Sequence, residues 1–166
     1  TEQDLTPYVL YYKNGKMAAE GYYMDQLKDS VWTYYSEFDG TVRMRETYMA
    51  GKLDGPVTKY YPDGAISEEL NWKEKRREGF WRQFYEDGSP RLEALFRDDQ
   101  LNGSYKVYFQ NGRLIMQGDY LHDRSTGNWE YYEENGKLLY ELEYKDGLPV
   151  DQELYMKLMQ DTLLNA

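Results

Sequence analysis

A turn glycine that recurs every 24 or 25 residues constrains this chain more than any other feature. An Asn or Asp precedes that glycine each time, and an aromatic residue follows it eight positions later each time. A fixed period of this length is typical of a repeat architecture, in which each unit buries its apolar face against its neighbours. The six glycines are Gly15, Gly40, Gly64, Gly88, Gly112 and Gly136.

The residues around each glycine predict a β-hairpin. Asn-Gly or Asp-Gly between two β-prone runs is the strongest short-range hairpin signal, because both turn residues must accept positive φ. A second turn closes each unit, as at Met49-Ala50-Gly51. We therefore predict an all-β fold, an elongated antiparallel β-hairpin repeat meander of about six 24-residue units over residues 8–150. Residues 1–7 are polar and form an N-terminal lead-in.

The tail follows a different pattern. Its apolar residues fall at helical spacing, so residues 151–166 are predicted to form a C-terminal amphipathic α-helix, with Asp151 as its N-cap. Such a helix would cap the open edge after the last unit; docking onto a partner is the alternative. The spaced residues are Leu154, Tyr155, Leu158, Met159 and Leu163.

The length of the Asn-Gly loop decides which face of the sheet is the core. A two-residue loop pairs Tyr12 with Met17, and the same register brings together the pairs Tyr8/Gly21, Leu10/Ala19, Tyr61/Ile66, Val107/Met116, Phe109/Leu114, Trp81/Ala94 and Trp129/Leu142. The first-strand exceptions to an apolar face are Ser36, Lys59, Gln83 and Glu133. A three-residue loop with a bulge would instead turn Arg82, Lys106 and Glu130 toward the core. We favour the first register, because a buried unpaired charge costs several kcal/mol.

On the favoured register, one aromatic residue per unit lies on the face opposite the core. A polar, mostly acidic position runs beside this row. The rings can simply cover the second side of the sheet as cross-strand pairs, or they can offer anchors to a partner. The aromatic residues are Tyr11, Tyr35, Tyr60, Phe84, Tyr108 and Tyr132; beside them run Glu20, Glu69, Glu93 and Glu141, with Arg45 in the second unit and Gln117 in the fifth.

Composition excludes several classes of function. The net charge of −10 argues against nucleic acid or an anionic membrane as the main partner. The one basic cluster, Lys73 to Arg77, is expected to be a solvated loop. Without cysteine, and with His122 as the single histidine, the chain shows no catalytic triad, metal cluster or phosphate loop. We therefore predict no enzyme activity, no metal and no cofactor.

Two units carry a resemblance to a known family. Residues Trp81 to Gly103 and Trp129 to Gly147 follow Trp-x-x-aromatic-x-x-(Asn/Asp)-Gly-x-Leu, then Glu, an aromatic residue and Gly. This scheme resembles the MORN repeat, in the variant found in bacterial proteins, over about residues 8–150. The sequence departs from the scheme at Asp29 and Ser30, where other units have glycine, and at Val57, which replaces an aromatic residue.

The resemblance implies a non-catalytic module that binds or scaffolds proteins, with an antitoxin-like role among the candidates. It also implies a capacity for self-association, so a homodimer is one expected assembly. The alternative is glycan or cell-wall binding through the aromatic row, since aromatic rings stack on sugars or quaternary amines. The chain begins at Thr1 rather than Met, which slightly favours an exported or cell-envelope protein.

Overall fold

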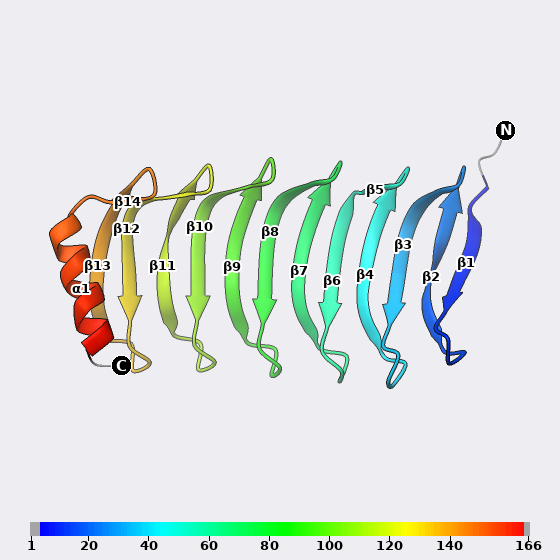
Figure 1. The fold of residues 1–166 in the computed structure, drawn as a ribbon, viewed down its shortest axis with the longest axis horizontal. Helices are drawn as coiled ribbons and strands as arrows, with labels where there is room; N and C mark the ends of the chain where they lie inside the picture. Colours follow the sequence, from blue (N-terminus) through cyan, green and yellow to red (C-terminus); the bar gives the residue numbers. More distant parts are fainter. Residues whose placement is uncertain (1–3, 165–166) are drawn as a thin grey trace.

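The computed structural model describes residues 4–164 and consists of one 14-stranded antiparallel sheet followed by a single helix. The strands follow one another along the sheet in chain order, with the short β5 pairing β4 at the side of this path (Figure 1). The predicted meander and the C-terminal helix are thus confirmed. The predicted lead-in lies partly outside the described residues, because residues 1–3 fall beyond them and β1 already begins at Thr6.

Each of the six units contributes two long strands, and two short strands close the second and sixth units. The strands are β1 (Thr6–Tyr11), β2 (Met17–Met24), β3 (Leu27–Tyr35), β4 (Val42–Met49), β5 (Lys52–Leu53), β6 (Gly55–Tyr60), β7 (Ile66–Lys73), β8 (Arg76–Phe84), β9 (Pro90–Arg97), β10 (Gln100–Tyr108), β11 (Leu114–Leu121), β12 (Arg124–Tyr132), β13 (Leu138–Lys145) and β14 (Leu148–Pro149); α1 spans Gln152–Leu164.

The Asn/Asp-Gly pairs lie at strand reversals, but the predicted two-residue loop is wrong. Gly15 N donates to Tyr12 O at 3.0 Å and Tyr12 N donates to Lys16 O at 2.8 Å, which closes a three-residue loop. Asn14 Oδ1 stabilises the loop by accepting the Lys16 amide at 3.0 Å. The extra residue of the second unit lengthens its loop by one, so that Ser36 faces Thr41.

The strand register is nevertheless the favoured one, because a β-bulge takes back the extra loop residue. Leu10 lies opposite Ala19 and Tyr8 opposite Gly21, as predicted. Between Leu10 and Tyr11 the register shifts by one residue, and the same shift recurs in all six hairpins. Three predicted pairs beside the loops are therefore wrong: Met17, Ile66 and Leu114 face Tyr11, Tyr60 and Tyr108, not Tyr12, Tyr61 and Phe109.

The core of this single-layer sheet is made by side chains of one hairpin lying over the next. Trp32 is fully buried and Trp129 is 3 % exposed. Each indole lies against the backbone of a glycine in the preceding strand, Gly21 or Gly118, where an added Cβ would fall inside the ring. Each indole also donates its Nε1–H to a backbone carbonyl, at 3.0 Å to Tyr22 and at 3.2 Å to Asp119. Glycine is thus required here by close approach rather than by a turn.

Two polar exceptions on the core face are explained by one carboxylate. Glu68 forms an ion pair with Lys59 at 3.1 Å and accepts hydrogen bonds from Gln83 at 2.8 Å and Trp81 at 3.3 Å. Burial opposes ionisation of Glu68, but these three donors outweigh it and lower the pKa of the carboxyl. Lys59 and Glu68 can therefore lie on the apolar face because their charges are paired and hydrogen-bonded.

A row of tyrosines beside the first turns links neighbouring units. The hydroxyls of Tyr12, Tyr61 and Tyr85 donate to backbone carbonyls 23 residues ahead, at 2.6, 2.6 and 2.5 Å respectively. The acceptors belong to Tyr35, Phe84 and Tyr108. Phenylalanine takes the equivalent position in the fifth unit, so this link is absent there.

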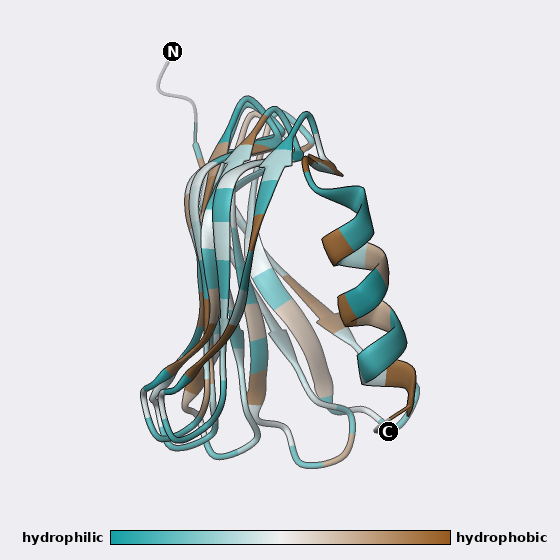
Figure 2. Cartoon of the chain, turned by 90° about the vertical axis from the view of Figure 1, so that its left-hand side faces the viewer, coloured by the Kyte–Doolittle hydropathy of each residue, from teal (hydrophilic) through white to brown (hydrophobic). Residues whose placement is uncertain are grey.

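The C-terminal helix lies to one side of the last strands, as seen from the C-terminal end of the sheet in Figure 2. Asp151 is its N-cap, because its Oδ1 accepts the Leu154 amide at 2.9 Å. None of its described residues is fully buried; Tyr155, Leu158 and Met159 are half-buried. The predicted helix and its cap residue are confirmed, and most of the described helix residues remain exposed.

Replacing Gly118 by Ala should lower the free energy of unfolding by about 1–3 kcal/mol, because the new methyl group must displace the Trp129 indole. Urea denaturation followed by tryptophan fluorescence measures the change. Ser104→Ala, an exposed substitution one strand away, is the control. Equal effects of the two variants would contradict the close-approach interpretation.

Replacing Tyr85 by Phe should lower the free energy of unfolding by about 1 kcal/mol, since it removes one hydrogen bond between units and keeps the ring. Chemical denaturation measures the loss. The matched control is Tyr22→Phe, which removes a hydroxyl without a hydrogen bond among the described residues. If both substitutions are neutral, the tyrosine link contributes no net stability.

Candidate functional site

The six aromatic residues singled out in the sequence lie on the face opposite the core. We call Tyr11, Tyr35, Tyr60, Phe84, Tyr108 and Tyr132 the aromatic ladder, and the surface that carries them the ladder face. Each occupies the last position of the first long strand of its unit. Because that strand alternates without interruption up to this residue, the ladder side chains point away from the Trp and Tyr side chains of the core.

Acidic side chains of the preceding unit accept hydrogen bonds from two of the ladder rings. The Tyr35 hydroxyl donates to Glu20 Oε1 at 2.5 Å, and the Tyr108 hydroxyl donates to Glu93 Oε2 at 3.1 Å. In both pairs the two residues are 15 positions apart in the sequence. The predicted acidic row and the predicted aromatic row thus meet in space, in an alternating order across the sheet.

Two further pairs keep this geometry with different chemistry. Arg45 Nη1 donates to the Tyr60 hydroxyl at 3.1 Å, and its guanidinium lies 5.4 Å from the centre of that ring. Gln117 Nε2 lies 3.4 Å from the Tyr132 hydroxyl, which itself donates to Glu130. The residue beside the ladder therefore contacts the next unit even where Arg45 or Gln117 replaces the acid.

The middle and the end of the ladder differ from this pattern. Phe84 has no hydroxyl to offer Glu69; that acid instead lies opposite Arg82 in the strand pairing, and the Arg82 guanidinium stacks 4.4 Å from the centre of the Phe80 ring. Glu141 has no seventh unit ahead of it and accepts a hydrogen bond from Asn128 at 3.0 Å.

The ladder rings are half-buried rather than fully exposed. Tyr11, at the open N-terminal end of the sheet, is 64 % exposed, whereas the other five are intermediate. Neighbouring units cover the sides of each internal ring, which leaves part of each ring accessible. The sequence shows which residues share a face but not how far neighbouring units cover them.

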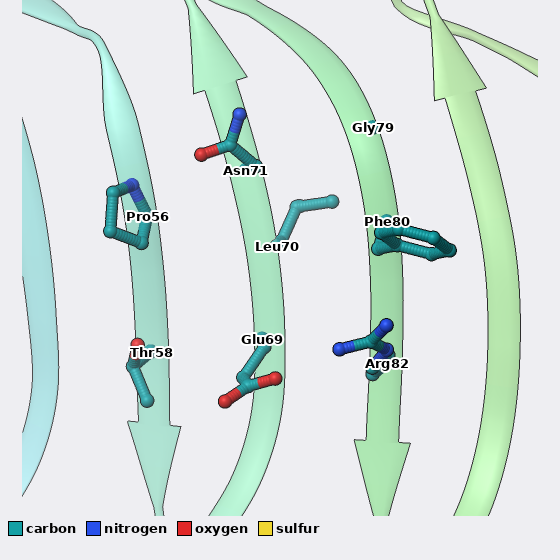
Figure 3. A pocket seen from close by; sticks show the side chains of 8 residues that line it. All are labelled: Pro56, Thr58, Glu69, Leu70, Asn71, Gly79, Phe80 and Arg82. Carbon is teal, nitrogen blue, oxygen red and sulfur yellow. The ribbon is translucent and has the colours of Figure 1, made fainter.

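Hollows repeat on the ladder face at equivalent positions of alternate units. The central one encloses ≈ 410 Å³ between the third and fourth units, and Figure 3 shows its walls. Hollows of ≈ 290 Å³ and ≈ 250 Å³ lie between the first and second and between the fifth and sixth units. The walls of the central hollow are Pro56, Thr58, Glu69, Leu70, Asn71, Gly79, Phe80 and Arg82.

The hollows form where the pairing of neighbouring units shifts register. This shift lies next to Gly21, Leu70 and Gly118 in the three places. Their chemistry changes along the sheet: Val9 and Val31 line the first, Pro56 and Phe80 the second, and only polar or charged side chains such as Lys106, Asp119 and Glu130 the third. A residue with positive φ lies inside each of these shifts, Ser30, Gly79 or Gly127, so the glycine that recurs at this place marks the shift in the sequence. The depth of the hollow beside it depends on the side chains of two units and is not marked.

Hydrogen bonds and burial raise the pKa of several ladder phenols. The bond to Glu20 raises the pKa of Tyr35 most, and burial adds to it. Burial is the main cause for Tyr108, followed by its bond to Glu93. For Tyr132 the bond to Glu130 is the main cause of the raised pKa. A phenol that donates to a carboxylate resists ionisation, because a phenolate would repel the acceptor.

Three further features of the described residues bear on chemistry: metal-ligating groups, His122 and the basic cluster. Within residues 4–164, no group of three or more His, Cys, Asp and Glu side chains could hold a metal ion. The exposed His122 ring lies 3.1 Å from the Gln100 amide oxygen. In the basic cluster, Arg76 and Arg77 form ion pairs with Asp98 at 3.7 Å and Asp99 at 2.6 Å, which reduces its free positive charge.

Comparison with known proteins agrees with the hairpin array. The family model described as MORN repeat variant matches residues 7–25, 53–74, 101–122 and 125–146, together about half of the chain. The four matched segments correspond to the strand pairs β1–β2, β6–β7, β10–β11 and β12–β13. No curated protein matches the chain. The helix among residues 4–164 is too short and too polar to cross a membrane.

The free energy of unfolding should fall as the pH rises above about 10. The folded-state pKa values of Tyr35 and Tyr108 lie above the unfolded value of about 10. Their contribution is therefore complete below that pH and is lost as the pH rises through the raised pKa. Urea denaturation across the alkaline range measures this loss, and a Tyr35→Phe, Tyr108→Phe double variant should weaken the pH dependence.

Phe84→Leu is the control for this experiment, because it changes a ladder ring that has no hydroxyl. It should lower stability by the same amount at every pH. An alkaline profile of the double variant that parallels the wild type would contradict the assignment.

Proposed function

Because the chain belongs to the MORN repeat variant family, we propose that it is a non-catalytic module that binds another protein through its ladder face. MORN repeats are generally modules that bind proteins or membranes. The observation that supports the ladder face most is its combination of half-buried aromatic rings with hollows repeated at equivalent positions. Rings held in fixed positions lose little conformational entropy on binding, which makes them good anchors.

The charge of the chain favours a protein partner over nucleic acid or an anionic membrane. The net charge of −10 disfavours an anionic membrane or nucleic acid. Two of the four cations in the basic cluster are already paired with aspartates of the next turn. Within this proposal, the module either neutralises a toxin or holds other proteins together.

A substitution that narrows the central hollow should weaken partner binding without unfolding the protein. Asn71→Tyr is suited to this, since Tyr22 occupies the equivalent position beside the first hollow and the fold accepts it there. We expect a partner captured from the native host by the wild type to be recovered in a much smaller amount with Asn71→Tyr. Quantitative mass spectrometry of the captured proteins, together with the melting temperature of each variant, provides the measurement.

The control is Leu163→Ser and Leu164→Ser combined, which removes two exposed apolar side chains of α1, outside the ladder face. It should retain the partner. Loss of the partner with this control but not with Asn71→Tyr would place binding elsewhere on the molecule.

A further inference from the structure

The spacing of the aromatic ladder restricts the shape of a partner segment that runs along it. One ladder ring occurs in each two-strand unit, so successive rings are about 9.6 Å apart along the sheet. A segment that contacts several rings in the same way must present an equivalent side chain at each such step. This inference rests on the proposed function, since it names the chemistry of the partner at the same face.

Only one common backbone conformation meets this spacing with a whole number of residues on one side. An α-helix advances 9.6 Å in about 6.4 residues, which is not a whole number of turns. A β-strand advances about 10 Å in three residues, but its side chains alternate, so successive contacts would fall on opposite sides. A polyproline II helix has three residues per turn and advances about 9.3 Å per turn, which returns the same side to each ring.

We propose that the ladder face binds a cationic, proline-rich segment in the polyproline II conformation, running across the strands with one turn per unit. The mismatch of about 0.3 Å per turn reaches only about 1.5 Å over five units. Aromatic-lined grooves recognise this conformation because it is already ordered before binding.

The hollows form a row beside the ladder, since none of the six rings lines them, and they supply sites for prolines on the flank of the segment at a multiple of the same period. They occur between alternate units, so they lie about 19 Å apart, which equals about six residues of a polyproline II helix. The walls of the central hollow include Pro56 and the Phe80 ring, which is 56 % exposed. A pyrrolidine ring can pack against both.

Charge selects a basic segment at the C-terminal end of the sheet. Asp119 and Glu130 line the hollow between the fifth and sixth units, where Lys106 is the one cation among the lining residues. Glu141 lies beside this hollow and bonds Asn128, which also lines it. A lysine at every third residue of the segment would face these carboxylates.

The test uses fluorescent 15-residue peptides of about five turns and the full chain. The probe is a repeated Pro-Pro-Lys peptide; a Gly-Gly-Lys peptide keeps the charge without the conformation, and a scrambled peptide keeps the composition without the three-residue period. We expect the Gly-Gly-Lys and scrambled peptides to bind at least about tenfold more weakly, and Asn71→Tyr to weaken the Pro-Pro-Lys peptide to a similar degree.

Equal affinity for the Gly-Gly-Lys peptide would overturn the proposal, because charge alone would then explain binding. Equal affinity for the scrambled peptide would overturn the match between turn and unit. No binding of the Pro-Pro-Lys peptide, while Asn71→Tyr still weakens capture of a host protein, would overturn the polyproline assignment but leave the ladder face as the binding site. Retention on polysaccharide that Asn71→Tyr weakens would assign the face to sugars instead.

Discussion

This fold depends on burial between neighbouring hairpins, because its single sheet has no second layer to pack against. The indoles of Trp32 and Trp129 become solvent-inaccessible only because a glycine in the preceding strand lets each ring lie on the backbone. Where Leu70 replaces that glycine, Trp81 is only half-buried and turns its Nε1–H to Glu68. The stability of each unit is therefore set largely by the side chain that its neighbour presents.

The sequence was sufficient to predict the order of the strands, the core face and the helix, because all three follow from periodicity and turn residues. It was insufficient for the loops. Asn-Gly suits a two-residue turn, but the side chain of Asn14 favours a three-residue loop by accepting the Lys16 amide. The two-residue turns occur at the opposite ends of the strands. In the turn between β7 and β8, for example, Glu74 and Lys75 both adopt positive φ without being glycine. There the pairing of long strands on both sides imposes the turn against local preference.

The ladder face shows the same limit for the candidate site. Alternation along the strand predicted which residues share the face, and the structure places Glu20 and Tyr35 in direct contact. Burial of the rings and the hollows beside them depends on contacts between units, which no single unit encodes. Structural and binding roles need not compete here: the hydrogen bonds that join the units also fix the rings in place, which is what a rigid recognition surface requires.

The longer loop of the second unit shows how an array of this kind tolerates change. One additional residue is accommodated between Ser36 and Thr41, and the pairing of β3 with β4 continues as in the other units. The effect of the insertion ends within that loop, because the bulge that follows is the same as elsewhere. The Asn/Asp-Gly loops can thus vary in length from one protein to another, or receive a grafted peptide. The turns at the opposite ends of the strands and both faces of the sheet keep their form.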